Sequence, residues 1–557
     1  MVANKLSTSS IFCDHEHLNR DEELMTIRRR DFLTAIPTLA AAAGLPRAFA
    51  QGSAPVKGGT LRMWIVEPTM LTGAFNSAGQ IYQISGKMFD GLVEYDFNFN
   101  PTPKLATAWK LSPDAKKLTF TLRNDVKWHD GKPFTSADLK FSALEVWRKL
   151  HPRGKAIWAN LVDVETPETT TAVFKLSNPS PYVMNALVGV ESQVLPRHIY
   201  EGTNILTNPA NLAPVGNGPF RFKEWRRGDY LLLERNPDYW DAGRPYLDSI
   251  VVSFTPDEGA RAVALEAGEL DLAGGLPVAL PDARRLERVP TLEIPTKGYE
   301  ALAHQVFMEL NVRKPYFKDA RVRRAVYHAI DRDFLLKNIW FNFGKVATGP
   351  ISSDLKNFYT PDVPRYEFSI AKANQLLDEA GLTKDANGVR LRITHDSNPF
   401  GGENNRRISA YFKQQMDLVG IKVDIRAGDT ATFIKRVYTD YDFDTTSTQA
   451  FGLSDPTIGV QRFYWSKNIV PGVAFSNGSG YSNPEVDKLL EAAQSEIDPS
   501  KRTALFHDFQ RIIMRDLPLL PLIDGQYFAV RSRAVVGTEA TPYGIHDNFV
   551  NVYLAKR

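Results

Sequence analysis

Residues 108–142 read AWKLSPDAKKLTFTLRNDVKWHDGKPFTSADLKFS, and this stretch decides the fold. Leu118, Phe120 and Leu122 alternate with polar residues, the pattern of a strand that buries one face. Residues 129–131, His-Asp-Gly, predict a turn, and we expect the His and Asp side chains to fix it. The first half of the stretch therefore predicts a strand that ends in a tight turn.

A helix start follows this turn within the same stretch. Thr135 precedes Asp138 by three residues, the spacing typical of a capping box. Phe141, Leu144 and Trp147 then recur at helical spacing. The stretch as a whole predicts a β-turn-α unit, which is a building block of an α/β lobe.

Length and composition limit the possible architectures. A chain of 557 residues is too long for one ordinary core, so we expect two or three lobes. Hydrophobic residues make up 43% and charged residues 24%, as in a soluble globular protein. The net charge is only +3, which gives no electrostatic reason to expect a nucleic acid or an anionic membrane as partner.

Residues 1–50 carry the pattern of an export signal. Residues 28–33 read RRRDFL and resemble the twin-arginine motif, and the apolar run at 34–45 is too short for a membrane anchor. Residues 48–50, Ala-Phe-Ala, form a small-residue cleavage site. We expect an N-terminal extension and signal peptide cleaved after Ala50, and hence a periplasmic protein. A basic amphipathic helix of a cytoplasmic protein is the alternative.

The single cysteine, Cys13, lies upstream of the expected cleavage site. The mature chain would therefore contain no disulfide and no thiolate metal site. Gln51 is the first residue after the expected cleavage site, the position at which a lipid-anchored receptor carries cysteine. We therefore do not expect a lipoprotein. Met25 is a second candidate start of translation, since the residues before it are polar and without pattern.

The sequence of residues 108–142 resembles that of the family 5 extracellular solute-binding proteins, which are the dipeptide, oligopeptide and nickel receptors of ABC importers. In that family the segment reads roughly T-F-x-L-R-x-x-V-K-[FW]-H-D-G-x-P-F-T. Further matches follow in the family's order: 217–222 (NGPFRF), 231–240 (LLLERNPDYW), 319–332 (DARVRRAVYHAIDR) and 482–487 (SNPEVD). The resemblance covers nearly all of residues 57–557.

The resemblance implies an α/β fold of the periplasmic binding protein type (type II, cluster C). Two main lobes would close by a hinge, and a further lobe would be inserted. The expected boundaries are lobe I at 57–96, 214–300 and 523–557, lobe II at 97–213, and lobe III at 301–522.

The same resemblance implies a substrate-binding component of an ABC importer. It would act as a monomer, capturing a small solute, with a peptide or amino-acid derivative expected, and delivering it to an inner-membrane permease. A metal-chelate (nickel), opine or sugar receptor of the same fold is the nearest alternative. A cell-envelope enzyme is the alternative from another class, but the chain contains no H-E-x-x-H, G-x-S-x-G or G-x-x-x-x-G-K-[ST] motif. The histidines after residue 50 are scattered, so we expect no metal site and no cofactor.

One departure from the family pattern concerns the ligand's amino group. Peptide receptors of the family carry an aspartate three residues before a [DE]-P step, where it meets this amine. Here Asp455-Pro456 is that step, and the earlier position is Gly452. A free α-amine would then lose a charged hydrogen bond, which contributes about 1.5–3 kcal/mol, and ordinary peptides are disfavoured. Alternatively, another acid such as Asp455 takes the role.

Further candidates for ligand binding are arginine and aromatic residues. Arg406 and Arg407 lie before an expected helix, near where dipeptide receptors place a carboxylate-binding arginine, although a solvated surface position is the more common setting for such arginines. Aromatic side chains can form the walls of a cleft or simply pack in the core. The aromatic candidates are Trp64, Tyr299, Phe451 and Trp465.

Overall fold

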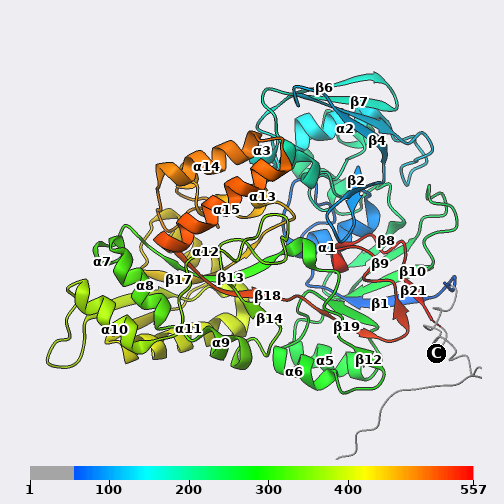
Figure 1. Ribbon diagram of the computed structural model, residues 1–557. Coiled ribbons are helices and arrows are strands. Elements are labelled where there is room, and N and C mark those ends of the chain that lie inside the picture. Colours follow the sequence, from blue (N-terminus) through cyan, green and yellow to red (C-terminus); the bar gives the residue numbers. More distant parts are fainter. Residues whose placement is uncertain (1–54, 556–557) are drawn as a thin grey trace, which may run out of the picture. The chain divides into compact units, whose positions relative to one another are not determined.

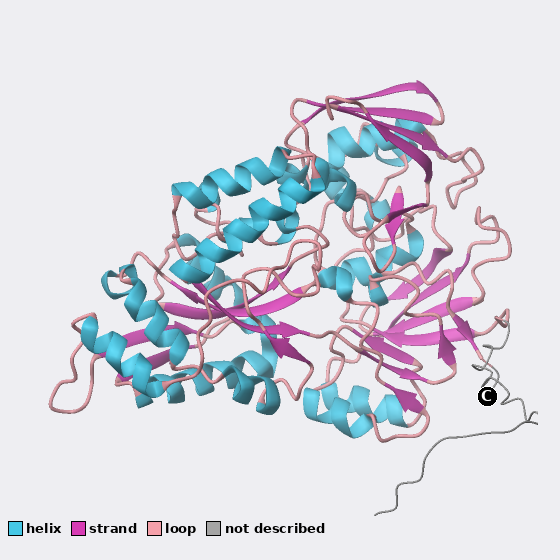
Figure 2. Ribbon diagram, viewed as in Figure 1, coloured by secondary structure: helices cyan, strands magenta, loops and turns pink. Residues whose placement is uncertain are grey.

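Three β-sheets, of seven, six and four strands, organise residues 55–555, which are the part of the chain that the computed structural model describes. Helices flank each of these sheets (Figures 1 and 2). The expected signal peptide and its cleavage site lie outside the described residues. Within residues 55–555, no helix has the length and apolar character needed to cross a membrane.

The seven-stranded sheet draws its strands from both ends of the described chain. Its order is β12 (Leu292–Glu293), β19 (Ala529–Ser532), β11 (Leu272–Gly274), β1 (Thr60–Trp64), β10 (Ser249–Ser253), β9 (Tyr230–Arg235) and β8 (Phe220–Arg226). β1 pairs in parallel with β10 and β11, and the other pairs are antiparallel. Helices α1 (Gly79–Met88) and α5 (Glu258–Glu266) contact β8 and β19, and α6 (Leu280–Leu286) follows β11.

The four-stranded sheet contains the strand predicted from residues 108–142. Its antiparallel order is β4 (Ala106–Leu111), β5 (Lys117–Leu122), β7 (Thr171–Leu176) and β6 (Leu161–Glu168). Leu118, Phe120 and Leu122 are buried, which confirms the predicted alternation. Helix α2 (Ser136–Phe141) begins after Thr135, whose N–H donates to the Asp138 carboxylate at 2.9 Å, so the predicted helix start is also confirmed.

The turn between β5 and α2 is built only partly as predicted. Asp130 accepts the Lys132 N–H at 3.2 Å inside the turn. The His129 ring points out of the turn instead: its Nδ1 accepts the Gly216 N–H and its Nε2 donates to the Gly218 carbonyl, both at 3.1 Å. Burial lowers the pKa of His129 to about 4, which keeps the ring neutral. His129 therefore ties this sheet to the chain that leads into β8, a contact distant in sequence that the local motif could not predict.

The six-stranded sheet is covered on both faces. Its order is β14 (Gly344–Val346), β18 (Leu519–Gly525), β13 (His304–Leu310), β17 (Thr445–Phe451), β15 (Leu391–Asp396) and β16 (Ile421–Arg426). In Figure 1, α14 (Pro484–Ser495) and α15 (Pro499–Asp516) lie on one side, and α8 (Ala320–His328), α9 (Arg332–Asn338), α10 (Ile370–Glu379) and α11 (Gly402–Leu418) lie on the other. Every residue of β13 and β18 is buried, because helices cover both faces of these central strands.

Short elements complete the described chain. The strands and α-helices among them are β2 (Val93–Tyr95), β3 (Pro101–Pro103), β20 (Val535–Val536), β21 (Tyr553–Leu554), α3 (Gly154–Ile157), α4 (Arg197–Tyr200), α7 (Pro315–Lys318), α12 (Thr430–Ile434) and α13 (Pro456–Gly459). The start of α11 corrects one prediction. Because the helix begins at Gly402, Arg406 and Arg407 lie inside its first two turns and not before it.

Candidate functional site

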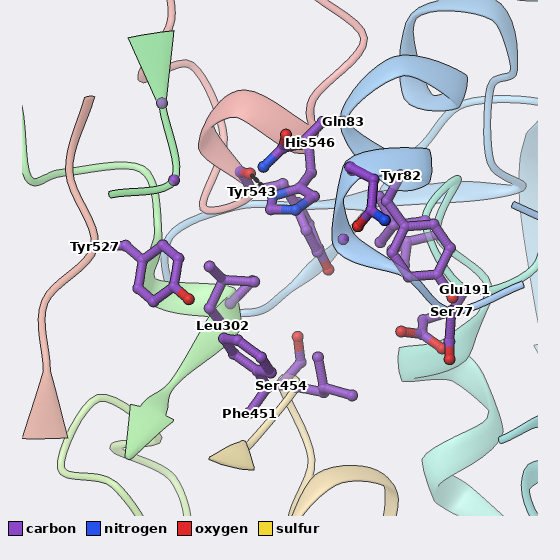
Figure 3. A pocket seen from close by; sticks show the side chains of 18 of the residues that line it. Ser77, Tyr82, Gln83, Glu191, Leu302, Phe451, Ser454, Tyr527, Tyr543 and His546 are labelled. Atoms are coloured by element: carbon purple, nitrogen blue, oxygen red, sulfur yellow. Dashed lines mark hydrogen bonds between the residues drawn. The ribbon is translucent and has the colours of Figure 1, made fainter. Parts of the chain in front are cut away.

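A cavity of about 380 Å³ lies between segments that belong to, or directly follow, strands of the seven-, six- and four-stranded sheets. β1 and β11 contribute Trp64 and Gly274, the segment after β7 contributes Asn185 and Glu191, and β17 contributes Phe451. Figure 3 shows Tyr527, Leu302 and Phe451 on one side of the cavity and Tyr82, Ser77 and Glu191 on the other. Elements far apart in sequence therefore enclose a single space, the usual setting of a small-molecule site.

Aromatic rings form one wall of the cavity. The Tyr527 ring packs against Phe451 at 5.9 Å and against His304 at 5.0 Å between centroids. Trp64 donates its indole N–H to the Thr255 carbonyl at 2.8 Å, so its ring is held in place. These rings present a rigid apolar surface at little entropic cost to a ligand.

A buried ion pair lies on the opposite side. Arg153 donates from Nε and Nη2 to the two carboxylate oxygens of Glu191, at 3.0 and 2.5 Å. The same Nη2 reaches the Tyr82 hydroxyl at 3.0 Å. The side chains of Arg153 and Glu191 are only 18% and 5% exposed, so this pair is screened little by solvent.

His151 sets the direction of the Tyr82 hydroxyl. The His151 Nδ1 accepts the Gly154 N–H at 2.9 Å, so in the neutral ring Nε2 carries the hydrogen and donates to the Tyr82 oxygen at 3.0 Å. Burial lowers the pKa of His151 to about 3, and burial together with Glu191 raises the pKa of Tyr82. Tyr82 thus accepts two hydrogen bonds, and its own proton remains to be donated, with the cavity beside it.

The remaining polar lining is neutral. Amide and hydroxyl groups come from Ser77, Gln80, Gln83, Asn185 and Ser454. Burial, and then the charge of Lys87, lowers the pKa of the lining residue His546 to about 4, so it too is uncharged at neutral pH. Groups of this kind both donate and accept hydrogen bonds, which suits amide-containing solutes.

The structure brings two of the sequence-predicted residues, Trp64 and Phe451, to the cavity. Gly452 lies outside its lining, and a Cβ at this position would come within 2.9 Å of Ala303 and Leu355. An acidic side chain at this position would therefore require its neighbours to move.

Asp455 is fully buried away from the cavity lining. Arg502 donates to both of its carboxylate oxygens at 2.7 Å, and Asn185 Nδ2 donates at 2.9 Å. The Asp455 carboxylate also caps α13 by accepting the Thr457 N–H at 2.9 Å. With these partners, Asp455 has no lone pair directed at a ligand amine in this structure.

The other predicted residues lie elsewhere. Arg406 and Arg407 project from α11 and pair with Glu403, and the Arg406 side chain is 69% exposed. Trp465 donates to Glu491 at 3.1 Å, away from the cavity. Tyr299 is buried behind the wall, with its ring 6.1 Å from that of Tyr527.

Sequence reasoning missed most of the lining. Arg153 and Glu191 are 38 residues apart and belong to none of the motifs identified in the sequence. Tyr527, Tyr543 and His546 come from the C-terminal segment, which carried no recognisable pattern. These residues meet through tertiary packing, so no local sequence pattern marks them as a group.

The family model of bacterial extracellular solute-binding proteins, family 5 (middle region), matches residues 100–472, more than half of the chain. The chain belongs to this family. The solute-binding protein is 28% identical to the oligopeptide-binding protein AppA of Bacillus subtilis over 482 residues, covering 83% of this chain and 86% of AppA. Members of the family serve ABC importers and are not enzymes, which confirms the predicted class.

Solved structures confirm the fold of the solute-binding protein. AppA of Bacillus subtilis in complex with a nonapeptide superposes with a TM-score of 0.76 at 26% identity, covering 90% of this chain and 100% of AppA. DppA of Helicobacter pylori in complex with the peptide STSA gives 0.74 at 26% identity, covering 90% and 99%. The predicted periplasmic binding protein fold is therefore correct.

Proposed function

We propose that this solute-binding protein captures a small peptide-like solute in the cavity and delivers it to the inner-membrane permease of an ABC importer. The observation that carries the proposal is the enclosed cavity, where an aromatic wall faces neutral amide and hydroxyl groups beside the buried Arg153–Glu191 pair. The relatives AppA and DppA, described as binding peptides, support a peptide-like solute over an opine, a sugar or a metal chelate.

The size of the cavity favours a short solute. Ligand sites for small molecules span roughly 300–1,000 Å³, and 380 Å³ lies near the lower end of this range. A nonapeptide, such as the one in the AppA complex, needs more room. We therefore propose a solute of about dipeptide or tripeptide size, with Trp64 and Phe451 as apolar contacts.

Two main lobes that close on the solute by a hinge, with a further lobe inserted, would explain both capture and release. We propose lobe I at 57–96, 214–300 and 523–557, lobe II at 97–213 and lobe III at 301–522. The strands of each large sheet fall within one of these lobes, except that β18 runs on to Gly525. Asn185 and Asp455 hydrogen-bond between proposed lobes II and III. Micromolar affinity, about −8 kcal/mol, suffices to close such lobes and hold the solute.

The proposed setting is the periplasm. The RRRDFL segment and the Ala-Phe-Ala site support export with cleavage after Ala50, and we propose that the mature protein works as a monomer. N-terminal sequencing of the exported protein and its elution in size-exclusion chromatography with light scattering test these two points.

Thermal unfolding of ligand-stripped, refolded protein tests the binding function. A solute that binds only the native state raises Tm, by an amount that grows with its concentration over Kd. Dipeptides and amino-acid conjugates should raise Tm, whereas opines, sugars and nickel chelates should not. A protein that responds to none of these solutes contradicts the proposal.

A further inference from the structure

The Tyr82 hydroxyl has a proton for which the protein provides no acceptor. The Tyr82 oxygen accepts hydrogen bonds from Nε2 of His151 and from Nη2 of Arg153, both at 3.0 Å. These two bonds occupy the acceptor positions of the oxygen, and no group among residues 55–555 accepts the phenolic proton. Toward any further partner, Tyr82 therefore acts only as a donor.

The two neighbours of Tyr82 fix this polarity. His151 accepts the Gly154 N–H at Nδ1, at 2.9 Å, so in the neutral ring only Nε2 carries a hydrogen. His151 is fully buried, and burial lowers its pKa to about 3, so the ring is neutral at pH 7. An arginine has no acceptor at all. Tyr82 therefore cannot donate its proton to either neighbour, as a tyrosine beside an accepting group would.

The hydroxyl lies at the cavity. Tyr82, Arg153 and Glu191 all line it, and Arg153 Nη2 lies 3.0 Å from the Tyr82 oxygen and 2.5 Å from Glu191 Oε1. Figure 3 shows Tyr82 and Glu191 on the same side of the cavity, across from Leu302 and Phe451. Tyr82 is only 6% exposed, and a buried donor without an acceptor is unfavourable. An acceptor atom of the solute at this point would satisfy it.

The electrostatics around the hydroxyl favour a neutral acceptor over a carboxylate. Among the described residues that line the cavity, Glu191 is the only acid and Arg153 the only arginine or lysine, and two hydrogen bonds join them. Glu191 raises the pKa of Tyr82 by more than Arg153 lowers it, so the pair acts on the hydroxyl with a net negative potential. A carboxylate would be repelled there, whereas a carbonyl oxygen accepts the proton without adding charge.

We propose that the Tyr82 hydroxyl donates to an amide carbonyl oxygen of the solute and so determines specificity for solutes that carry this group. A solute without an acceptor at this point leaves the buried donor unpaired and is rejected. His151 is the positioning residue: it does not line the cavity, but it keeps the hydroxyl a donor. This inference rests on the proposed function and names the group by which the peptide-like solute is recognised.

Three related probes test the acceptor: the dipeptide Ala-Phe, its thioamide, whose sulfur is a weaker acceptor than oxygen, and Ala-phenethylamide, which lacks the carboxylate. In calorimetric titration of refolded, ligand-stripped native protein, Ala-Phe should bind about tenfold more tightly than its thioamide, a difference of about 1.4 kcal/mol. Tyr82→Phe should bind Ala-Phe about tenfold more weakly and should not distinguish it from the thioamide.

Tyr200→Phe is the matched control for the loss of a buried hydroxyl. Tyr200 is 1% exposed and donates to Asn211 at 3.0 Å, outside the lining of the cavity. This variant should bind all three probes as the native protein does.

Two substitutions of His151 separate positioning from structure. His151→Gln keeps an N–H donor for the Tyr82 oxygen and should keep the preference for Ala-Phe over its thioamide. His151→Leu removes this donor, so the hydroxyl can accept as well as donate, and the preference should fall from about tenfold toward equal binding. A purely structural effect would weaken both probes alike and leave their ratio unchanged. Equal ratios in the two variants overturn the positioning role.

Other outcomes overturn the inference in distinguishable ways. If Tyr82→Phe binds Ala-Phe as tightly as the native protein, or loses equal affinity for Ala-Phe and its thioamide, the hydroxyl does not bind this carbonyl. If Tyr82→Phe weakens Ala-Phe but not Ala-phenethylamide, the acceptor is the carboxylate, and the inference fails while the proposed function stands. If none of the three probes binds, the proposed function fails and the inference fails with it.

Discussion

Two buried arginine–carboxylate pairs in this protein have the same chemistry and different surroundings. Asp455–Arg502 is sealed, with side chains 0% and 6% exposed, and it also caps α13. Glu191–Arg153 borders the cavity, with the arginine 18% exposed, and it shares a hydrogen bond with Tyr82. The pair in the recognisable Asp-Pro motif holds the scaffold, whereas the pair without a motif faces the ligand space. In this protein, the arginine–carboxylate pair that the family motif marks is therefore not the pair that borders the cavity.

The largest expected effect is at the sealed pair. The substitution Asp455→Ala leaves the Arg502 guanidinium buried without its counter-charge, so we expect a loss of about 3–5 kcal/mol in the free energy of unfolding. Urea unfolding followed by circular dichroism measures this loss. Asp362→Ala is the matched control, because Asp362 pairs with Arg511 while 79% exposed, and should cost less than about 1 kcal/mol. Equal effects of the two substitutions would contradict the distinction between sealed and open pairs.

The pair at the cavity should tolerate loss of its charge better. Glu191→Gln keeps hydrogen-bonding atoms near Arg153. Arg153 still donates to the Tyr82 hydroxyl and still borders the cavity. We therefore expect the substitution to lower the free energy of unfolding by about 1–3 kcal/mol. The same urea titration measures it. A cost as large as that of Asp455→Ala would mean that the cavity pair is as structural as the sealed one.

The stability of the protein should depend on pH partly through His151, which donates to Tyr82 beside the Arg153–Glu191 pair. Folding lowers the pKa of His151 from 6.5 to about 3, so the unfolded chain binds the proton and the folded ring does not. The contribution of His151 is therefore complete above pH 6.5 and is lost as pH falls toward 3. The free energy of unfolding, measured in urea, should fall between pH 7 and pH 5. In His151→Gln this fall should be about 1–2 kcal/mol smaller than in the native protein.

Other groups titrate in the same window, so a control is needed. His129, His304, His395 and His546 have lowered pKa values with the same sign, while burial raises the pKa of Glu309 to about 8, with the opposite sign. All of these groups are common to both variants. The exposed Asn98→Ala variant, which removes no titratable group, should retain the native pH dependence. An identical change in His151→Gln and Asn98→Ala would show that burial at His151 does not control the difference.

The smallest expected effect concerns the bond between the proposed lobes. Asn185→Ala removes the hydrogen bond to Asp455 and should cost about 0.5–1.5 kcal/mol, seen as roughly two- to tenfold weaker solute binding. Calorimetric titration with the dipeptide that raises Tm most measures this. The exposed Asn98→Ala variant serves as control. Unchanged affinity in Asn185→Ala would mean that this bond does not distinguish the closed arrangement.

Local interactions explain which parts were predictable from sequence. The alternation of Leu118, Phe120 and Leu122 and the Thr135–Asp138 helix start depend on residues a few positions apart, and both were correct. The cavity was largely unpredicted, because Arg153, Glu191 and Tyr527 converge only when three separate sheets pack. Asp455 and Gly452 were predicted as ligand-binding positions from the family's sequence motif, but the structure places both outside the lining of the cavity. Whether any of these residues touches the solute stays a prediction.

The composition of the seven-stranded sheet has a consequence for how the chain is made. Ala273 of β11 pairs with Val530 of β19, so an inner strand of this sheet is synthesised long after the neighbour with which it pairs. The four-stranded sheet needs only residues 106–176 and can form early, whereas the larger sheet must wait for long-range pairing. A chain truncated before β19 would expose one edge of β11 and leave β12 without its neighbour in the sheet, and exposed edges invite aggregation. Synthesis of β19 is thus the step that allows the seven-stranded sheet to reach its native strand order.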